Sequence, residues 1–144
     1  MRLTSFTDYG LRALMQLAAE PARLFTTDEI AGAFGISRNH LKKIVQELSA
    51  AGIVVTQRGA NGGFRLARPP DQIGLGEIVR VLEARSALVE CFRADGGACV
   101  LNGACGLKTR LNAAREAFLR DLDRSTLADC ALPPARVGQD LAAP

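Results

Sequence analysis

The chain has 144 residues, of which 48% are hydrophobic and 23% charged, and its formal net charge is +3. A chain of this length fits one domain with appendages and can bury its own core. No apolar run approaches the ~18 residues of a membrane span, and no secretion signal is recognisable. We therefore expect a cytoplasmic protein with no membrane partner. Because thiols stay reduced there, clustered cysteines favour metal or redox chemistry over disulfides.

The positive charge is concentrated in the first half of the chain. Residues 1–68 carry nine Lys and Arg against five Asp and Glu, a net charge of +4, whereas the remainder carries a net charge of −1. Basic charge gathered in one part of a chain is the electrostatic signature of a nucleic-acid-binding domain.

Two helices are predicted before residue 36. Residues 5–20 repeat apolar side chains at helical spacing, and Ser5 and Asp8 have the spacing of a capping box at the start. A second capping box, Thr26 with Glu29, predicts the start of a shorter helix. This pattern indicates an amphipathic helix followed by a second one that packs beside it.

A third helix is predicted after Ser37, and Gly52 follows it at the position of a C-terminal cap. Its apolar face consists of Leu41, Ile44, Val45 and Leu48. Its outer face is polar and basic, and its candidate DNA-binding residues are Ser37, Arg38, Asn39, His40, Lys42 and Lys43. Two helices joined by a short glycine-containing turn predict a helix-turn-helix, with an ordinary αα-hairpin as the alternative.

The next segment decides between these alternatives. Residues 53–67 have two β-rich runs around a glycine-rich turn, which predicts a β-hairpin. A basic hairpin directly after a helix-turn-helix makes a winged helix, in which Arg58, Asn61 and Arg65 contact phosphates or a minor groove. We therefore predict a mainly α protein with a winged helix-turn-helix domain over residues 1–83 that binds double-stranded operator DNA.

The second half of the chain is predicted to contain a cysteine loop, residues 84–106, followed by a long helix, residues 107–130, and a tail, residues 131–144. The helical pattern itself continues to about Thr126, a length of roughly 30 Å at about 1.5 Å per residue. Its apolar stripe consists of Leu107, Leu111, Ala114, Phe118 and Leu122. We expect this stripe to form a homodimer, because helix-turn-helix repressors usually read two half-sites.

Three of the four cysteines, Cys91, Cys99 and Cys105, lie in the loop with the spacing Cys-x7-Cys-x5-Cys. This is not the paired spacing of a zinc ribbon, whereas soft thiolates on a glycine-rich loop suit an iron–sulfur cluster. A [4Fe-4S] cluster is favoured, with [2Fe-2S] as the alternative, and the former needs a fourth ligand. The protein candidates are Cys130, His40, Asp95 and Asp8. The residues alone leave Asp8, Asp95 and a small exogenous ligand open.

Residues 3–14, 37–44 and 58–66 together resemble the NsrR branch of the bacterial winged-helix iron–sulfur regulators, a family that also includes the IscR regulators of cluster assembly. The resemblance extends over residues 1–130. It implies a homodimeric repressor that senses nitric oxide and then releases operator DNA. It also implies a cluster on the three loop cysteines, completed by Asp8 from the partner subunit.

Other functions agree with parts of the pattern. A redox or electron-transfer iron–sulfur protein would need no basic hairpin, and a zinc-stabilised winged helix would not respond to nitric oxide. A sibling regulator that senses iron supply, cluster status or redox stress shares the fold and the ligands, and it is the main alternative. His40 is the single histidine and has no neighbouring nucleophile, so we do not expect an enzyme.

Overall fold

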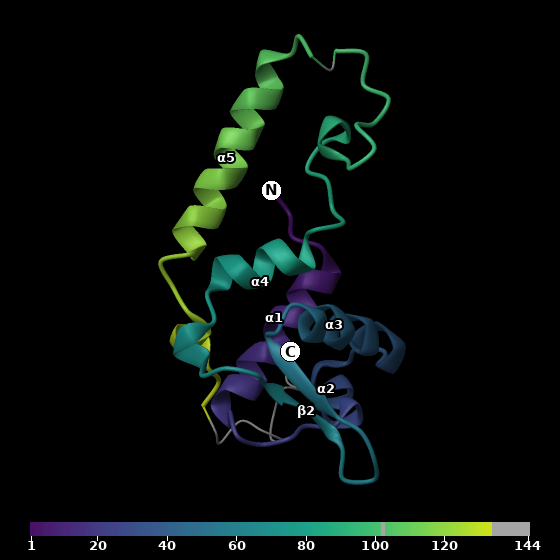
Figure 1. The fold of residues 1–144 in the computed structure, drawn as a ribbon, viewed down its shortest axis with the longest axis vertical. Helices are drawn as coiled ribbons and strands as arrows, with labels where there is room; N and C mark the ends of the chain where they lie inside the picture. Colours follow the sequence, from purple (N-terminus) through teal and green to yellow (C-terminus); the bar gives the residue numbers. More distant parts are fainter. Residues whose placement is uncertain (102, 134–144) are drawn as a thin grey trace.

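The computed structural model describes residues 1–101 and 103–133, so that Asn102 and residues 134–144, most of the predicted tail, lie outside the described residues. The molecule has a winged-helix body (residues 1–82 and 123–133) and an arm (residues 83–122) that rises from it (Figure 1). The elements are α1 (Ser5–Ala19), α2 (Thr27–Phe34), α3 (Arg38–Ala50), β1 (Val54–Gln57), β2 (Gly63–Leu66), α4 (Leu75–Leu82) and α5 (Gly106–Leu122), with short 3₁₀ turns η1 (Pro70–Gln72), η2 (Glu90–Phe92) and η3 (Leu127–Cys130).

Side-chain caps set the starts of α2 and α3. The Thr26 hydroxyl accepts a hydrogen bond from the backbone N–H of Glu29, whose carboxylate accepts one from the N–H of Thr26, so the predicted capping box is confirmed. The Ser37 hydroxyl accepts a hydrogen bond from the N–H of His40 at 3.1 Å. The turn between the helices contains Gly35 with φ of +63°, a conformation that glycine adopts at little cost. The two helices of the predicted helix-turn-helix are therefore locally encoded.

The predicted capping box at the start of α1 is wrong. The N-cap is Thr4, which has extended backbone angles, and its hydroxyl accepts a hydrogen bond from the N–H of Thr7 at 3.3 Å. Ser5 is already the first helical residue, so it cannot serve as the cap. Asp8 instead forms an ion pair with Arg12 one helical turn later, at 2.9 Å.

The core lies inside the body, where α1, α3, α4 and the hairpin meet. All four predicted apolar residues of α3 are buried. Each side chain of this kind contributes roughly 1.5–3 kcal/mol when it leaves water. The largest fully buried side chains are Phe25, Leu14, Leu17, Ile30, Leu41, Ile44, Leu48, Ile53, Ile73, Ile78, Leu127 and Val54.

The wing is an antiparallel hairpin in which Val54 pairs with Leu66 and Thr56 with Phe64. The hairpin is anchored to the body because the backbone of Phe25 exchanges two hydrogen bonds of 2.9 Å with Phe64. The predicted mainly α winged helix is thereby confirmed. No helix in the described part of the chain is both long and apolar enough to cross a bilayer.

The predicted helix over residues 107–130 is wrong at its C-terminal end. α5 ends at Leu122, and the chain turns back into the body. The N–H of Leu75 donates to the carbonyl of Ser125 at 3.0 Å, and the N–H of Leu127 donates to the carbonyl of Ile73 at 2.8 Å. Leu127 is fully buried. The helix ends before it because burying this side chain in the body stabilises the fold more than another turn of helix would.

Candidate DNA-binding surface and cysteine loop

The outer face of α3 and the wing border one groove of about 900 Å3. Arg38 and Lys42 line it from α3, Arg58 from the turn of the wing directly after β1, and Asp28 from the first turn of α2. The side chains of Ser37, Asn39 and Lys43 on α3 are also exposed, as are Asn61 and Arg65 of the wing. The groove thus gathers Arg38, Lys42 and Arg58 of the predicted DNA-binding residues, whereas Lys43 lines a different cavity, beside Phe6 of α1.

His40 differs from its neighbours on α3 because its ring packs against α1. The ring centroid lies 5.7 Å from that of Phe6 and 5.4 Å from that of Tyr9, with an interplanar angle of 81° in the second pair. The side chain is half-buried. Edge-to-face packing of this kind stabilises the contact between α1 and α3, so His40 has a structural role that the sequence did not indicate.

One residue of the groove was missed by the sequence analysis. The Asp28 Oδ1 atom lies 2.6 Å from the Arg38 Nε atom, so a carboxylate of α2 is paired with the first residue of α3. Asp28 stood in a predicted helix start, where an acidic residue has an ordinary local explanation. Nothing in its local sequence indicated contact with α3.

The cysteine loop connects α4 to α5 and consists mainly of turns. Cys91, Cys99 and Cys105 are half-buried free thiols, as is Cys130 in η3. Gly97 is required for the loop path, because its φ is +61° and a Cβ atom there would lie 2.5 Å from the carbonyl oxygen of Glu90.

Two acidic residues brace the loop from within. The carboxylate of Glu90 accepts a hydrogen bond from the N–H of Ala98, and that of Asp95 accepts one from the N–H of Gly97, both at 3.0 Å. Asp95 also pairs with Arg93 at 2.8 Å. Asp95, a candidate fourth ligand, therefore already has partners.

The loop thiols are not assembled into a metal site. Within residues 1–101 and 103–133, no three His, Cys, Asp or Glu residues form a group that could hold a metal ion. The chemical nature of the donors remains suitable, since three partly accessible thiols of one loop are the soft ligands that iron–sulfur clusters use. Binding of such a cluster would require the loop to draw the three thiols together.

Glu83 connects the base of the loop to the start of α1. Its Oε1 atom accepts hydrogen bonds from the N–H and hydroxyl of Thr4, both at 2.8 Å, and from the hydroxyl of the buried Thr7. Burial by itself raises the pKa of Glu83, but the hydrogen bonds from Thr7, Thr4 and Ser86 outweigh burial and bring this pKa below its ordinary value. The carboxylate is therefore held in its charged form.

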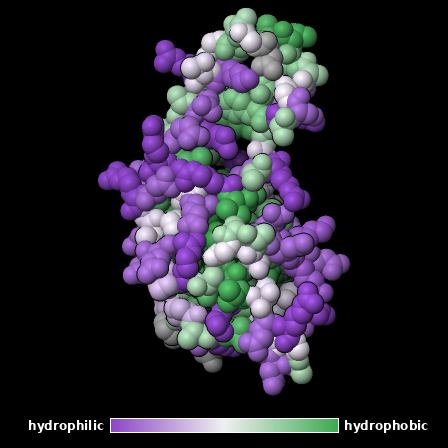
Figure 2. Space-filling model, viewed as in Figure 1, coloured by the Kyte–Doolittle hydropathy of each residue, from purple (hydrophilic) through white to green (hydrophobic). Residues whose placement is uncertain are grey.

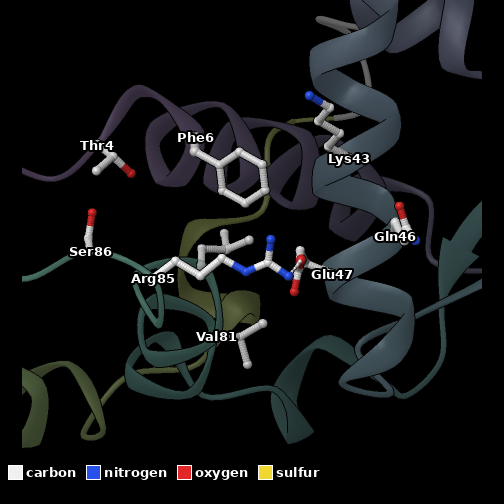
Figure 3. A pocket seen from close by; sticks show the side chains of 9 residues that line it. Thr4, Phe6, Lys43, Gln46, Glu47, Val81, Arg85 and Ser86 are labelled. Atoms are coloured by element: carbon white, nitrogen blue, oxygen red, sulfur yellow. Dashed lines mark ion pairs between the residues drawn. The ribbon is translucent and has the colours of Figure 1, made fainter. Parts of the chain in front are cut away.

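Arg85 connects the same base to α3. It extends along a cavity of about 490 Å3 between α1, α3 and the end of α4, and its Nη2 atom lies 2.8 Å from the Glu47 Oε1 atom (Figure 3). Phe6 of α1 and Lys43 of α3 line the same cavity. The segment that leads into the cysteine loop thus contacts both α1 and α3.

The arm exposes apolar side chains. Val100 is 96% exposed, and Leu101 and Leu107 are each 62% exposed. Figure 2 shows hydrophobic residues gathered at the end of the molecule that the loop and the start of α5 form. Of the predicted stripe on α5, Leu111, Phe118 and Leu122 are half-buried and Ala114 is exposed. These side chains leave a surface suited to a protein partner.

Residues 3–132 match the model of the Rrf2 family, which is described as an iron-dependent transcriptional regulator. The HTH-type transcriptional regulator NsrR of Geobacillus kaustophilus is 49% identical over 130 residues, which cover 90% of this chain and 88% of that protein. The NsrR of Shouchella clausii is 44% identical over 133 residues, which cover 92% of this chain and 89% of that protein.

Two solved structures are similar to this one. IscR of T. potens is 28% identical with a TM-score of 0.69, and the match covers 90% of this chain and 85% of that one. CymR, the global cysteine regulator of B. subtilis, is 32% identical with a TM-score of 0.70, over 91% of this chain and 96% of that one.

Proposed function

Because this chain belongs to the Rrf2 family of iron-dependent transcriptional regulators, we propose that it is a homodimeric iron–sulfur repressor that releases operator DNA in response to nitric oxide. The chain is a DNA-binding transcriptional regulator and not an enzyme. The observation that supports the response to nitric oxide is a winged helix joined directly to a loop with three thiols, in a chain 49% identical to an NsrR.

The proposed DNA contacts divide between α3 and the wing. α3 enters the major groove, where Arg38, Asn39 and Lys42 are nearest to base edges and Ser37 and Lys43 contact phosphates. Arg58, Asn61 and Arg65 of the wing contact the flanking backbone or minor groove. His40 contributes mainly by supporting α3, because its ring packs against α1.

The proposed cluster ligands are Cys91, Cys99 and Cys105 of one subunit and Asp8 of the partner subunit, with [4Fe-4S] favoured over [2Fe-2S]. When bound, the cluster supplies iron that reacts with nitric oxide. A carboxylate is a weaker partner for this soft centre than a thiolate, so Asp8 is the ligand that we expect to be lost most easily. In the isolated chain Asp8 pairs with Arg12, which offers its carboxylate an alternative partner.

The contacts at the base of the loop would carry a change in the loop to the DNA-binding surface. Glu83 holds the start of α1, and Arg85 holds Glu47 in α3. A loop that moves therefore changes the position of the helix that carries Asp8 and of the helix that reads DNA. A hundredfold change in DNA affinity needs only about 2.7 kcal/mol, which a few such contacts can supply.

The test is purification of the full chain without oxygen, an absorbance spectrum, and a nitric oxide titration that follows binding to a duplex selected from a random pool. We expect cluster absorbance, tight binding, and release with nitric oxide. Cys99→Ala should lose the cluster absorbance and the response, because one of the three thiols is removed.

The matched control is Cys130→Ala, which removes a thiol outside the loop and should retain both properties. A colourless wild-type protein, or a Cys99→Ala variant that still releases DNA with nitric oxide, would contradict the proposal. Release that follows iron depletion while nitric oxide has no effect would instead favour the sibling regulator that senses iron supply.

A further inference from the structure

We infer that Asp28 is a positioning residue that sets the base preference of Arg38. The inference rests on the proposed reading of DNA by α3, and it adds a specificity residue to that surface. It starts from the ion pair between the Asp28 Oδ1 and Arg38 Nε atoms, which are 2.6 Å apart at the mouth of the groove between α3 and the wing.

The backbone holds the two partners at a defined separation. Asp28 lies in the first turn of α2, whose start is set by the capping box of Thr26. Arg38 is the first residue of α3, directly after the cap Ser37. Because both positions are set by helix caps, the pair links the starts of the two helices that form the helix-turn-helix. The carboxylate is thus a support for the arginine and does not belong to the helix that reads DNA.

The atom that makes the contact determines what the arginine can still do. The ion pair is made at Nε, on the side edge of the guanidinium, so the end edge, formed by one N–H of Nη1 and one of Nη2, is left for another partner. These two groups are the ones that recognise O6 and N7 of guanine, the commonest specific contact in the major groove. An arginine held at Nε therefore loses less conformational entropy when it binds a base. Binding to guanine, which accepts from both amino groups, is strengthened most.

The charge of Asp28 adds a second effect, which acts against non-specific binding. Among the described residues, Lys42 and Arg58 of the same groove pair with no carboxylate, so they remain available for phosphates. Asp28 offsets the positive charge of Arg38. The two side chains remain 64% and 63% exposed, respectively. The carboxylate thus weakens the attraction of Arg38 to any phosphate backbone. The lost binding free energy is recovered only when Arg38 contacts a correctly placed base.

An ordinary structural role predicts a different outcome. An acidic residue in the first turn of a helix stabilises that helix through the helix dipole. Loss of that contribution would lower stability and would affect all DNA sequences alike. Only a positioning role predicts that substituting Asp28 reduces DNA affinity at one base pair alone, and that this reduction requires Arg38.

The experiment measures binding of the full chain, purified without oxygen, to a duplex selected by the wild type from a random pool and to all its single base-pair variants, by fluorescence anisotropy. We expect wild type to prefer guanine at one position by about tenfold or more, as a bidentate arginine does. Asp28→Asn should reduce this preference to about threefold or less and leave other positions unchanged. It should also steepen the salt dependence of non-specific binding by about one released counterion.

Three variants complete the design. Arg38→Ala should abolish the preference at the same position, and adding Asp28→Asn to Arg38→Ala should change it no further. Asp28→Glu should restore most of the preference, because it restores the carboxylate. Asp71→Asn removes one negative charge from the exposed turn η1, outside the groove, and should behave as wild type.

The outcomes separate this inference from the proposed function. If wild type discriminates between duplexes and Asp28→Asn retains the same guanine preference, the inference is wrong and the proposed function stands. The inference is also wrong if Asp28→Asn weakens all duplexes equally, or if it has the same effect in the Arg38→Ala background. If wild type shows no base preference at all, both are wrong.

Discussion

The winged-helix body and the arm differ in how they are held together. Every one of the largest fully buried side chains belongs to the body. In the described part of residues 83–122, Leu119 is the only buried side chain, and it lies at the end of α5 that packs on the body. The cysteine loop is braced mainly by polar contacts of its own acidic residues and by Glu83 and Arg85 at its base.

This difference indicates that the body and the arm have separate parts in the proposed response to nitric oxide. The body has a core of its own and can keep the helix-turn-helix in shape without a ligand. The arm lacks such a core, so its conformation is open to whatever binds the thiols or covers α5. A region with few buried contacts is the one from which moving and binding segments are drawn.

The largest expected effect is on stability, and it should be confined to the body. Leu41→Ala removes a side chain that is 0% exposed and should cost about 2–5 kcal/mol of unfolding free energy. Leu107→Ala, the same substitution at a site 62% exposed in the arm, should change it by less than about 0.5 kcal/mol. Urea unfolding followed by circular dichroism measures both, and equal losses would remove the distinction between the two regions.

The next effect concerns association of two chains through α5. Leu111→Asp places a charge in the middle of the apolar stripe and should weaken the dimer about thirtyfold, the size of an interface hot spot. Sedimentation equilibrium is the measurement, and Asn112→Asp, an exposed neighbour outside the stripe, is the control. A Leu111→Asp protein that associates as tightly as wild type would show that the stripe is not the interface.

A smaller effect concerns Glu83 and pH. The folded-state pKa of Glu83 lies below its ordinary value of 4.5, so its carboxylate contributes stability above that pH and loses this contribution as the pH falls through the lowered pKa. Glu83→Gln should therefore cost about 1–2 kcal/mol at neutral pH, and this deficit should shrink as the pH falls below 4.5. Thermal unfolding at a series of pH values tests the sign. A deficit that grows towards acid would contradict it.

The smallest effect on stability is expected at Arg85, whose ion pair with Glu47 is exposed to solvent. Arg85→Ala should cost no more than about 1 kcal/mol of unfolding free energy. If the pair carries part of the signal, the change in DNA affinity caused by nitric oxide should nevertheless fall about twofold to threefold, as a contact of this strength allows. Arg110→Ala on α5 is the matched control, and an identical response in the two variants would exclude Arg85 from the coupling.

Features set by neighbouring residues were predictable from the sequence. The capping box of Thr26, the cap Ser37, the apolar face of α3 and the hairpin all depend on contacts within a few positions, and all are observed. The three thiols of the loop were found in the same way, because their spacing is visible in the chain.

Which distant groups meet depends on how the helices pack against one another. Thr4 caps α1 where it also binds Glu83, a residue 79 positions away, and no local pattern contains that distance. The packing of His40 on α1, the pairing of Asp28 with Arg38 and the end of α5 before Leu127 arise in the same way, from helices brought together by the core. Periodicity indicates that a helix buries one face, but the position of its polar groups depends on the neighbour against which that face packs.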